Sequence, residues 1–172
     1  MSRRLFVAIA VPQSVQQQIS QWQSRHAPVG SQPVAASNYH LTLAFCGDCC
    51  TATEQELCQQ LDAIKAEGWQ QVLDSTGWFA KPAIGYLAPS VAKAPLLTLY
   101  EAVKAAAEAA AIKLPEQSFV PHVTVFRHHR HGAHWQPPLT PLSWPVSDFR
   151  LYHSHQGDYH QLRRWPLQAG SN

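Results

Sequence analysis

Two short segments of one pattern, in which a histidine and a threonine are separated by one apolar residue, constrain this chain most. The first segment is His40–Leu43 and the second is His122–Val125, and each reads His-x-Thr-x with aliphatic residues at x. The chain holds 10 histidines, but chance would place far fewer than one such match among them, so two matches are informative. We therefore treat both segments as the same kind of structure.

Each segment is typical of a β-strand that is buried on one face. Side chains at positions i and i+2 of a strand share a face, and the side chain between them points the other way. His40 and Thr42 are therefore expected to project together, as are His122 and Thr124, while the intervening aliphatic side chains enter a core. Each strand thus presents one imidazole and one hydroxyl group side by side.

The surroundings of the two segments also correspond. A strand over residues 5–11 precedes a helix with an apolar stripe, a proline-containing loop and the first segment. A strand over residues 84–87 precedes an alanine-rich helix over 95–112, a second proline-containing loop and the second segment. This order indicates an α+β fold with two similar half-chain units, about residues 5–47 and 84–127, within a single domain spanning residues 1–172.

The remaining chain is expected to form shorter elements. Ser14 and Thr53 each have a glutamine or glutamate three residues later, which predicts capping boxes at the starts of two helices, the second of which ends near Gly68. Further expected elements are short strands at 72–73 and 78–79, a strand over 119–126, a loop over 128–145, and a hairpin of strands 146–152 and 159–162.

Composition excludes several classes of protein. With 45% hydrophobic residues the chain has enough apolar material for a core, and a formal charge of +2 with only 14% charged residues excludes a histone-like binder of polyanions. Contact with nucleic acid must therefore be local.

The N-terminus and the cysteines indicate the compartment. Arg3 and Arg4 precede an apolar run that resembles a signal peptide, but the run is short and ends at Pro12, so a buried strand is the better interpretation, and no segment is long enough to cross a membrane. Three of the four cysteines crowd together, which suits neither a disulfide framework nor a zinc site. We expect reduced cysteines in a cytoplasmic protein without membrane contact.

Four segments together resemble a known family. They are Arg4–Ile9, His40–Gly47, Pro121–Arg127 and Leu162–Leu167, and they extend over nearly the whole chain. The sequence is similar to the two-histidine phosphoesterases, and most of all to the bacterial RNA 2′,3′-cyclic phosphodiesterases, historically named 2′-5′ RNA ligases. Cys46 and Ala10 depart from the family's pattern, but neither lies in a His/Thr pair. The resemblance implies two pseudo-symmetric lobes, each an antiparallel sheet with helices on its outer face, and an active-site cleft between them.

The same resemblance implies a reaction and its residues. It implies a monomer that hydrolyses 2′,3′-cyclic phosphate ends of RNA to 2′-phosphomonoesters without a metal or other cofactor, with His40 as proton donor and His122 as proton acceptor. The chemistry agrees, because histidine titrates near neutral pH and two imidazoles can serve the two sides of one phosphate. Thr42 and Thr124 are expected to donate hydrogen bonds to the phosphate oxygens. The sequence by itself does not order the roles of the two histidines.

Two further residues are candidates for substrate contact. Arg127 offers a fixed positive charge to the phosphate, although strand alternation would place it on the opposite face from His122 unless a bulge intervenes. Phe45 is a candidate for stacking on a base, with burial in the core as the alternative.

Other functions remain open at this point. The same site would suit 2′-5′ linkages or small cyclic nucleotides, or ligation in the reverse direction. A non-enzymatic RNA-binding or metal-binding module is suggested by the histidines of one segment, although their spacing lacks helical geometry. They are His128, His129, His131 and His134. Arg130, Arg163 and Arg164 are either an RNA-guiding rim or ordinary surface charge.

Overall fold

Strands form most of the regular structure in this computed structural model, which describes residues 1–128 and 140–170. The described elements, in chain order, are β1 (Ser2–Ala10), α1 (Gln13–His26), β2 (Gln32–Pro33), the 3₁₀ helix η1 (Ala36–Asn38), β3 (His40–Cys50), α2 (Thr51–Asp62), β4 (Trp69–Leu73), β5 (Ser75–Phe79), β6 (Ile84–Ala88), α3 (Ala94–Ala109), β7 (Val123–Arg127), β8 (Leu142–Val146), β9 (Asp148–His155) and β10 (Asp158–Pro166).

Two groups of antiparallel strands meet at one residue pair. The first group is β10, β9, β1 and β3, and the second is β7, β6, β5 and β2. The strand order is β10-β9-β1-β3-β7-β6-β5, with β2 paired to β7 and a separate two-stranded sheet of β4 and β8. Strands β3 and β7 are paired through Leu41 and Val123, both fully buried. The segments that carry the His/Thr pairs therefore pass each other at the junction of the two groups.

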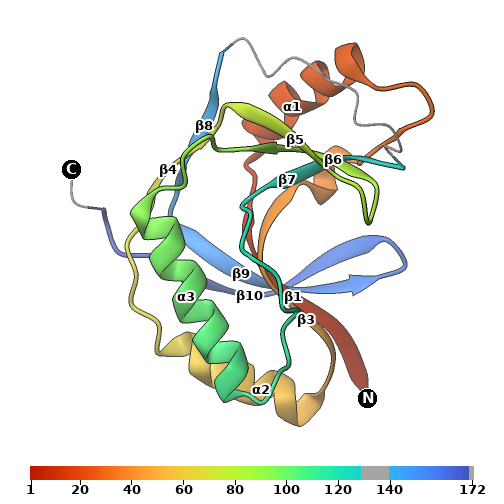
Figure 1. Ribbon diagram of the computed structural model, residues 1–172. Coiled ribbons are helices and arrows are strands. Elements are labelled where there is room, and N and C mark those ends of the chain that lie inside the picture. Colours follow the sequence, from red (N-terminus) through yellow and green to blue (C-terminus); the bar gives the residue numbers. More distant parts are fainter. Residues whose placement is uncertain (129–139, 171–172) are drawn as a thin grey trace.

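The helices cover the sheet in an exchanged arrangement. Helices α2 and α3 lie side by side and contact β3 (Figure 1). Helix α1 follows β1 in sequence, yet it packs on β7, where Gln23 Nε2 donates to the Val125 carbonyl oxygen at 2.7 Å and Trp22 lies against Phe126. The division into half-chain units thus stays a prediction. If the two units are related, each contributes its helix to the strands of the other unit.

The α+β class and most of the elements agree with the sequence-based expectations. The helices over 13–26 and 94–109, the strand beginning at His40 and the C-terminal hairpin are all present. Neither capping box forms, because α1 begins after Pro12 and α2 begins after Cys50, without a side-chain cap at either start.

Three boundaries also differ from the expectations. Helix α2 ends at Asp62, since residues 66–68 instead run beside Gln168, which exchanges backbone hydrogen bonds with Ala66 and Gly68. Strand β7 begins at Val123 rather than at residue 119, and β8 occupies the end of the segment expected to be a loop. Among the described residues, no helix has the length and apolar character needed to cross a membrane.

Candidate active site

Strand β3 places His40 and Thr42 on one face. Leu41 and Leu43 between and beyond them are buried, whereas both polar side chains are partly exposed. His40 Nδ1 lies 2.7 Å from the carbonyl oxygen of Asn38, at the end of η1. The ring is therefore anchored by the backbone that leads into its own strand.

The second segment repeats this arrangement around β7. Val123 and Val125 are fully buried, and His122 and Thr124 are partly exposed. His122 Nδ1 lies 2.6 Å from the carbonyl oxygen of Val120, again two residues before the histidine. Both imidazoles are thus held by the same local bond.

The junction between the strands brings the two pairs together. Residues directly paired in an antiparallel sheet share a face, and their neighbours on both strands share the other face. Because Leu41 pairs with Val123 in the core, the residues on either side of them project together from the opposite face. Those residues are His40, Thr42, His122 and Thr124.

The backbone bonds fix which ring nitrogen faces outward. A carbonyl oxygen only accepts hydrogen bonds, so Nδ1 of each histidine must carry the hydrogen. In the neutral ring Nε2 then has a free lone pair, and in the charged ring it carries a proton that it can donate. Each histidine is consequently presented as an acid or base through Nε2.

Burial favours the neutral form of both rings in the free protein. It lowers the pKa of His40 to about 4, against the opposing effect of the hydrogen bond to Asn38, and the positive charges of His122 and Arg127 lower this pKa further. Burial also lowers the pKa of His122, while the bond to Val120 opposes the change. The pairing of Leu41 with Val123 puts both imidazoles on one face, so a positive charge on His122 acts on His40.

Each imidazole is bordered by two aromatic rings. Around His40 they are Phe6, with ring centroids 4.8 Å apart, and Tyr159, at 5.1 Å and nearly perpendicular. Around His122 they are Phe79, at 5.2 Å, and Tyr86, at 5.1 Å. These four rings exclude water from the sides of the imidazoles, which accounts for the burial that lowers both pKa values.

A β-bulge in β3 turns Phe45 toward the face of His40. The register of β1 against β3 passes from Val7–Ala44 to Ala8–Thr42, which leaves Leu43 without an opposite residue. The extra residue reverses the alternation that follows it. Phe45 is 56% exposed as a result, and Cys46 is buried in its place.

A second bulge does the same to Arg127. The register of β6 against β7 passes from Gly85–Phe126 to Tyr86–Thr124, leaving Val125 without an opposite residue. Arg127 is exposed, and its Nη2 donates to the Tyr159 hydroxyl at 3.3 Å. The bulge that this arginine required is present, and it brings a charge from β7 to a ring that contacts His40.

The other candidate charges have different surroundings. Arg163 pairs with Asp62 at 2.9 Å and lies over the Trp165 ring, and Arg164 pairs with Asp148 at 3.7 Å. Arg130 and the histidines 129, 131 and 134 lie outside the described residues, whereas His128 is exposed just after β7. Within the described residues, no group of three or more histidine, cysteine, aspartate or glutamate side chains is arranged to hold a metal ion.

A cavity of about 210 Å³ lies beside His40. Its lining includes Phe6, Tyr152 and Tyr159 together with polar side chains from β9, β10, α1 and the segment before β3. Sequence reasoning missed these aromatic residues and Arg150, because only the pairing of β1, β9 and β10 brings them to His40. Alternation along β10 gave no sign that Tyr159 faces the site.

Comparison with known proteins is consistent over nearly the whole chain. Residues 9–85 match the family model of LigT like phosphoesterases. The chain is 31% identical to the RNA 2′,3′-cyclic phosphodiesterase of Escherichia coli (strain K12), over 96% of this chain and 97% of that protein. It is 30% identical to the protein of the same name from Thermus thermophilus, over 88% of this chain and 81% of that one.

The fold agrees as well. The crystal structure of E. coli LigT complexed with 3′-AMP superposes with a TM-score of 0.92 at 30% identity, covering 97% of this chain and 99% of that one.

Proposed function

The chain belongs to the LigT-like phosphoesterase family of the two-histidine superfamily, and on that premise we propose that it is an RNA 2′,3′-cyclic phosphodiesterase. Two relatives at about this identity carry that name, and one was crystallised with 3′-AMP, a nucleotide with its phosphate on the ribose. The proposed reaction opens the cyclic phosphate at an RNA end and leaves a 2′-phosphomonoester.

The proposed chemistry uses His40 and His122 on opposite sides of the phosphate. His122 Nε2 takes a proton from water as the water oxygen bonds to phosphorus. The bond between phosphorus and the 3′ oxygen breaks, and His40 Nε2 gives its proton to that oxygen. Proton exchange with solvent then restores both rings.

The matching backbone bonds of the two histidines carry this proposal. Nδ1 of each ring lies within 2.7 Å of the carbonyl oxygen two residues earlier, so both rings present Nε2. A histidine with only a structural role does not require a second histidine with the same backbone bond on the same face. Two equivalent imidazoles on one face suit a reaction that requires one acid and one base.

Substrate binding favours the protonated form of His40, which takes its proton from solvent. In the free protein the pKa of His40 is lowered to about 4, so the ring is neutral near pH 7. A phosphate anion close to the ring favours its charged form and raises this pKa. Thr42, Thr124 and Arg127 are proposed to hold the anion, which stabilises the charge that develops on its oxygens.

Several finer points belong to the same proposal. We infer that Phe45 stacks on an RNA base, which its 56% exposure beside the site supports. We also infer that residues 5–47 and 84–127 are related units, since each has a bulge and an anchored histidine at corresponding places. The four cysteines are free thiols, which supports a cytoplasmic location, and we infer a monomer. Ligation is the reverse direction and is expected to be minor in dilute solution.

The test is the loss of hydrolysis in single variants. His40→Ala and His122→Ala should each lower the rate on an RNA with a 2′,3′-cyclic end by about 10²–10⁴, the usual effect of losing a general acid or base. His155→Ala, an exposed histidine on β9, is the matched control and should keep the wild-type rate. Activity should persist in excess EDTA, and phosphorus NMR should show a 2′-phosphate.

Three results would contradict the proposal. Full activity of either variant would remove that histidine from the reaction. A 3′-phosphate product would mean that the bond to the 2′ oxygen breaks instead. Binding of RNA with no hydrolysis by the wild-type protein would favour the binding-module alternative.

A further inference from the structure

The cavity beside His40 contains polar groups that the proposed reaction does not use. His40 and Phe6 form the part of its wall nearest the site, and Gln16, Tyr39, Arg150 and Gln161 line the rest. Its volume of about 210 Å³ is below the range of about 300–1,000 Å³ typical of sites for drug-sized molecules. It therefore has room for one ring system rather than for a whole nucleotide.

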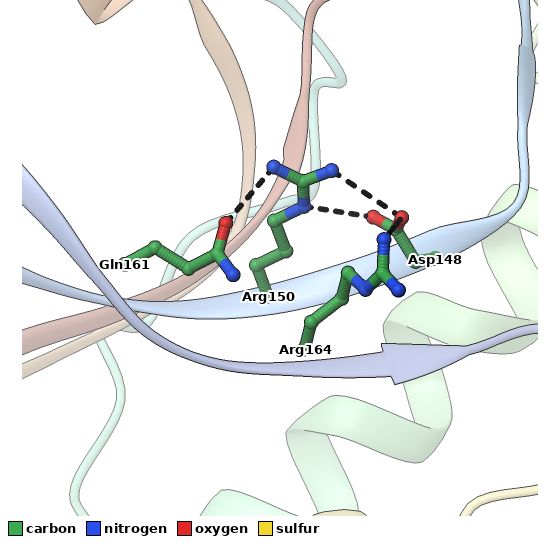
Figure 2. Close-up of polar contacts among 4 residues, drawn as sticks. All are labelled: Asp148, Arg150, Gln161 and Arg164. Atoms are coloured by element: carbon green, nitrogen blue, oxygen red, sulfur yellow. Dashed lines mark hydrogen bonds and ion pairs between the residues drawn. The ribbon is translucent and has the colours of Figure 1, made fainter.

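Arg150 holds Gln161 in a defined orientation. Figure 2 shows its guanidinium between two partners, with Nη1 donating to Gln161 Oε1 at 3.0 Å and Nε donating to Asp148 Oδ1 at 2.9 Å. The Gln161 oxygen is thereby occupied, and its NH₂ group is left as a donor. Since Asp148 also pairs with Arg164, the carboxylate has a fixed place behind the guanidinium.

Two other polar side chains complement this donor. Gln16 Nε2 donates to the Val11 carbonyl oxygen at 2.9 Å, which leaves its Oε1 as an acceptor. Tyr39 is only 3% exposed, and its hydroxyl has no hydrogen-bond partner among the described residues. A buried hydroxyl without a partner costs about 1–3 kcal/mol, and a bound ligand would recover that cost.

The nature of the walls indicates what that ligand is. Phe6 and Tyr152 stack with their ring centroids 5.1 Å apart and 13° between their planes, which gives the cavity an aromatic wall. Arg150 already donates to Asp148 through Nε and Nη2 and to Gln161 through Nη1, so few of its N–H groups remain for a second phosphate. A flat, uncharged ring with both donors and acceptors on its edge fits better.

We propose that this cavity binds the nucleobase of the terminal nucleotide, the one that carries the cyclic phosphate. The inference rests on the proposed function, in which His40 gives its proton to the 3′ oxygen of that nucleotide. The attacking water and the leaving oxygen lie on opposite sides of phosphorus, so the ribose and its base lie on the side of His40. The cavity adjoins that ring, and its donor and acceptor groups face a base edge.

The test compares two substrates that differ only in the base. Adenosine 2′,3′-cyclic phosphate has one, and methyl riboside 2,3-cyclic phosphate lacks it. Gln161→Leu and Tyr39→Phe should each lower kcat/KM for the adenosine compound about two- to tenfold, the value of one hydrogen bond, and leave that for the riboside unchanged. Gln70→Leu, on an exposed part of β4, is the matched control and should change neither.

Stability separates binding from a structural role. Tyr39→Phe removes a hydroxyl that has no partner among the described residues, so the midpoint of thermal unfolding should stay or rise while kcat/KM falls for the adenosine compound. Equal losses on both substrates, or no loss on either, would overturn the inference. An Arg150→Gln variant that loses rate only on substrates with a further phosphate would overturn it too and assign the cavity to phosphate. Failure of the wild-type protein to hydrolyse either compound would instead contradict the proposed function.

Discussion

Arg127 is proposed to affect the site in two ways, as a charge that holds the phosphate and as a charge that acts on His40. Its guanidinium donates to Tyr159, which contacts the His40 ring, and its charge contributes to the lowered pKa of that ring. Removing the charge should therefore weaken substrate binding and make His40 easier to protonate.

The pH profile of Arg127→Gln tests both effects. Loss of a charged hydrogen bond should lower kcat/KM about 10- to 100-fold. The proposed reaction needs His40 protonated and His122 neutral in the free protein, so kcat/KM should fall as pH rises above both lowered pKa values. In Arg127→Gln the pKa of His40 rises, so the limb of the pH profile that reports His40 should move to higher pH. Arg127→Lys should keep the limb in place, and an unmoved limb in Arg127→Gln would contradict the electrostatic role.

Some site residues were predictable from the sequence and others were not. His40 and Thr42 share a face through alternation alone, as do His122 and Thr124. The meeting of the two pairs depends on the long-range pairing of Leu41 with Val123. Phe6 reaches His40 only because β1 pairs with β3, and this long-range pairing leaves no local pattern.

The two bulged strands show how an element can override alternation. Phe45 and Arg127 each follow their histidine by an odd number of residues, yet bulges at Leu43 and Val125 return both side chains to the site. A bulge arises from the fit between two strands, so the sequence of one strand could show that Arg127 needed a bulge but not that one forms.

The predicted capping boxes were wrong for a related reason. Ser14 and Thr53 have the spacing of capping boxes, but a cap depends on where the preceding strand ends. Strand β3 continues to Cys50, which places Thr53 inside the first turn of α2, where its hydroxyl lies 3.3 Å from Cys50 Sγ. The apolar stripes of the helices, by contrast, were readable because burial imposes them.

The β5–β6 hairpin supports His122 through a glycine. Gly77 on β5 pairs with Tyr86 on β6, and the tyrosine ring lies over the glycine in the space that a Cβ would need. Tyr86 and Phe79 border the His122 ring. The absence of a side chain at residue 77 thus lets Tyr86 pack against the imidazole.

Gly77→Ala should displace the Tyr86 ring from His122. The proposed role of His122 is to take a proton from water rather than to bind substrate. The loss of support should therefore lower kcat about tenfold and change KM less. Exposure of the ring should also raise the pKa of His122 toward its ordinary value, which histidine NMR titration would detect. Tyr86→Phe keeps the ring and serves as the control, and an unchanged titration of His122 in Gly77→Ala would contradict the role.

Across the molecule, the site lies where the two groups of strands have the least pairing. Among the described residues, only Leu41 and Val123 pair β3 with β7. Helix α1 follows β1 in sequence but packs on β7, and helix α3 follows β6 but contacts β3. The exchanged helices tie the two groups together, so the site can remain open between the strands without separating them. Sequence order alone assigned each helix to its own half, since it contains no information on which sheet a helix covers.

Acidification should destabilise the whole molecule through the buried histidines. The pKa of His40 is lowered to about 4 in the folded protein and returns to about 6.5 on unfolding. Between these values the unfolded state binds a proton that the folded state does not, so the free energy of unfolding falls as pH decreases. From pH 7 to pH 4.5 this one group should cost about 2–3 kcal/mol, and His122 should add to the loss.

Urea denaturation at the two pH values measures that cost directly. The wild-type protein should lose more stability on acidification than His40→Gln, which has no group to protonate at this position. Phosphate should reduce the difference, because an anion beside the ring raises the pKa of His40 in the folded state. Equal losses in the two proteins would mean that the pKa of His40 is not lowered in the folded state. Bound phosphate would then not be needed to keep His40 protonated.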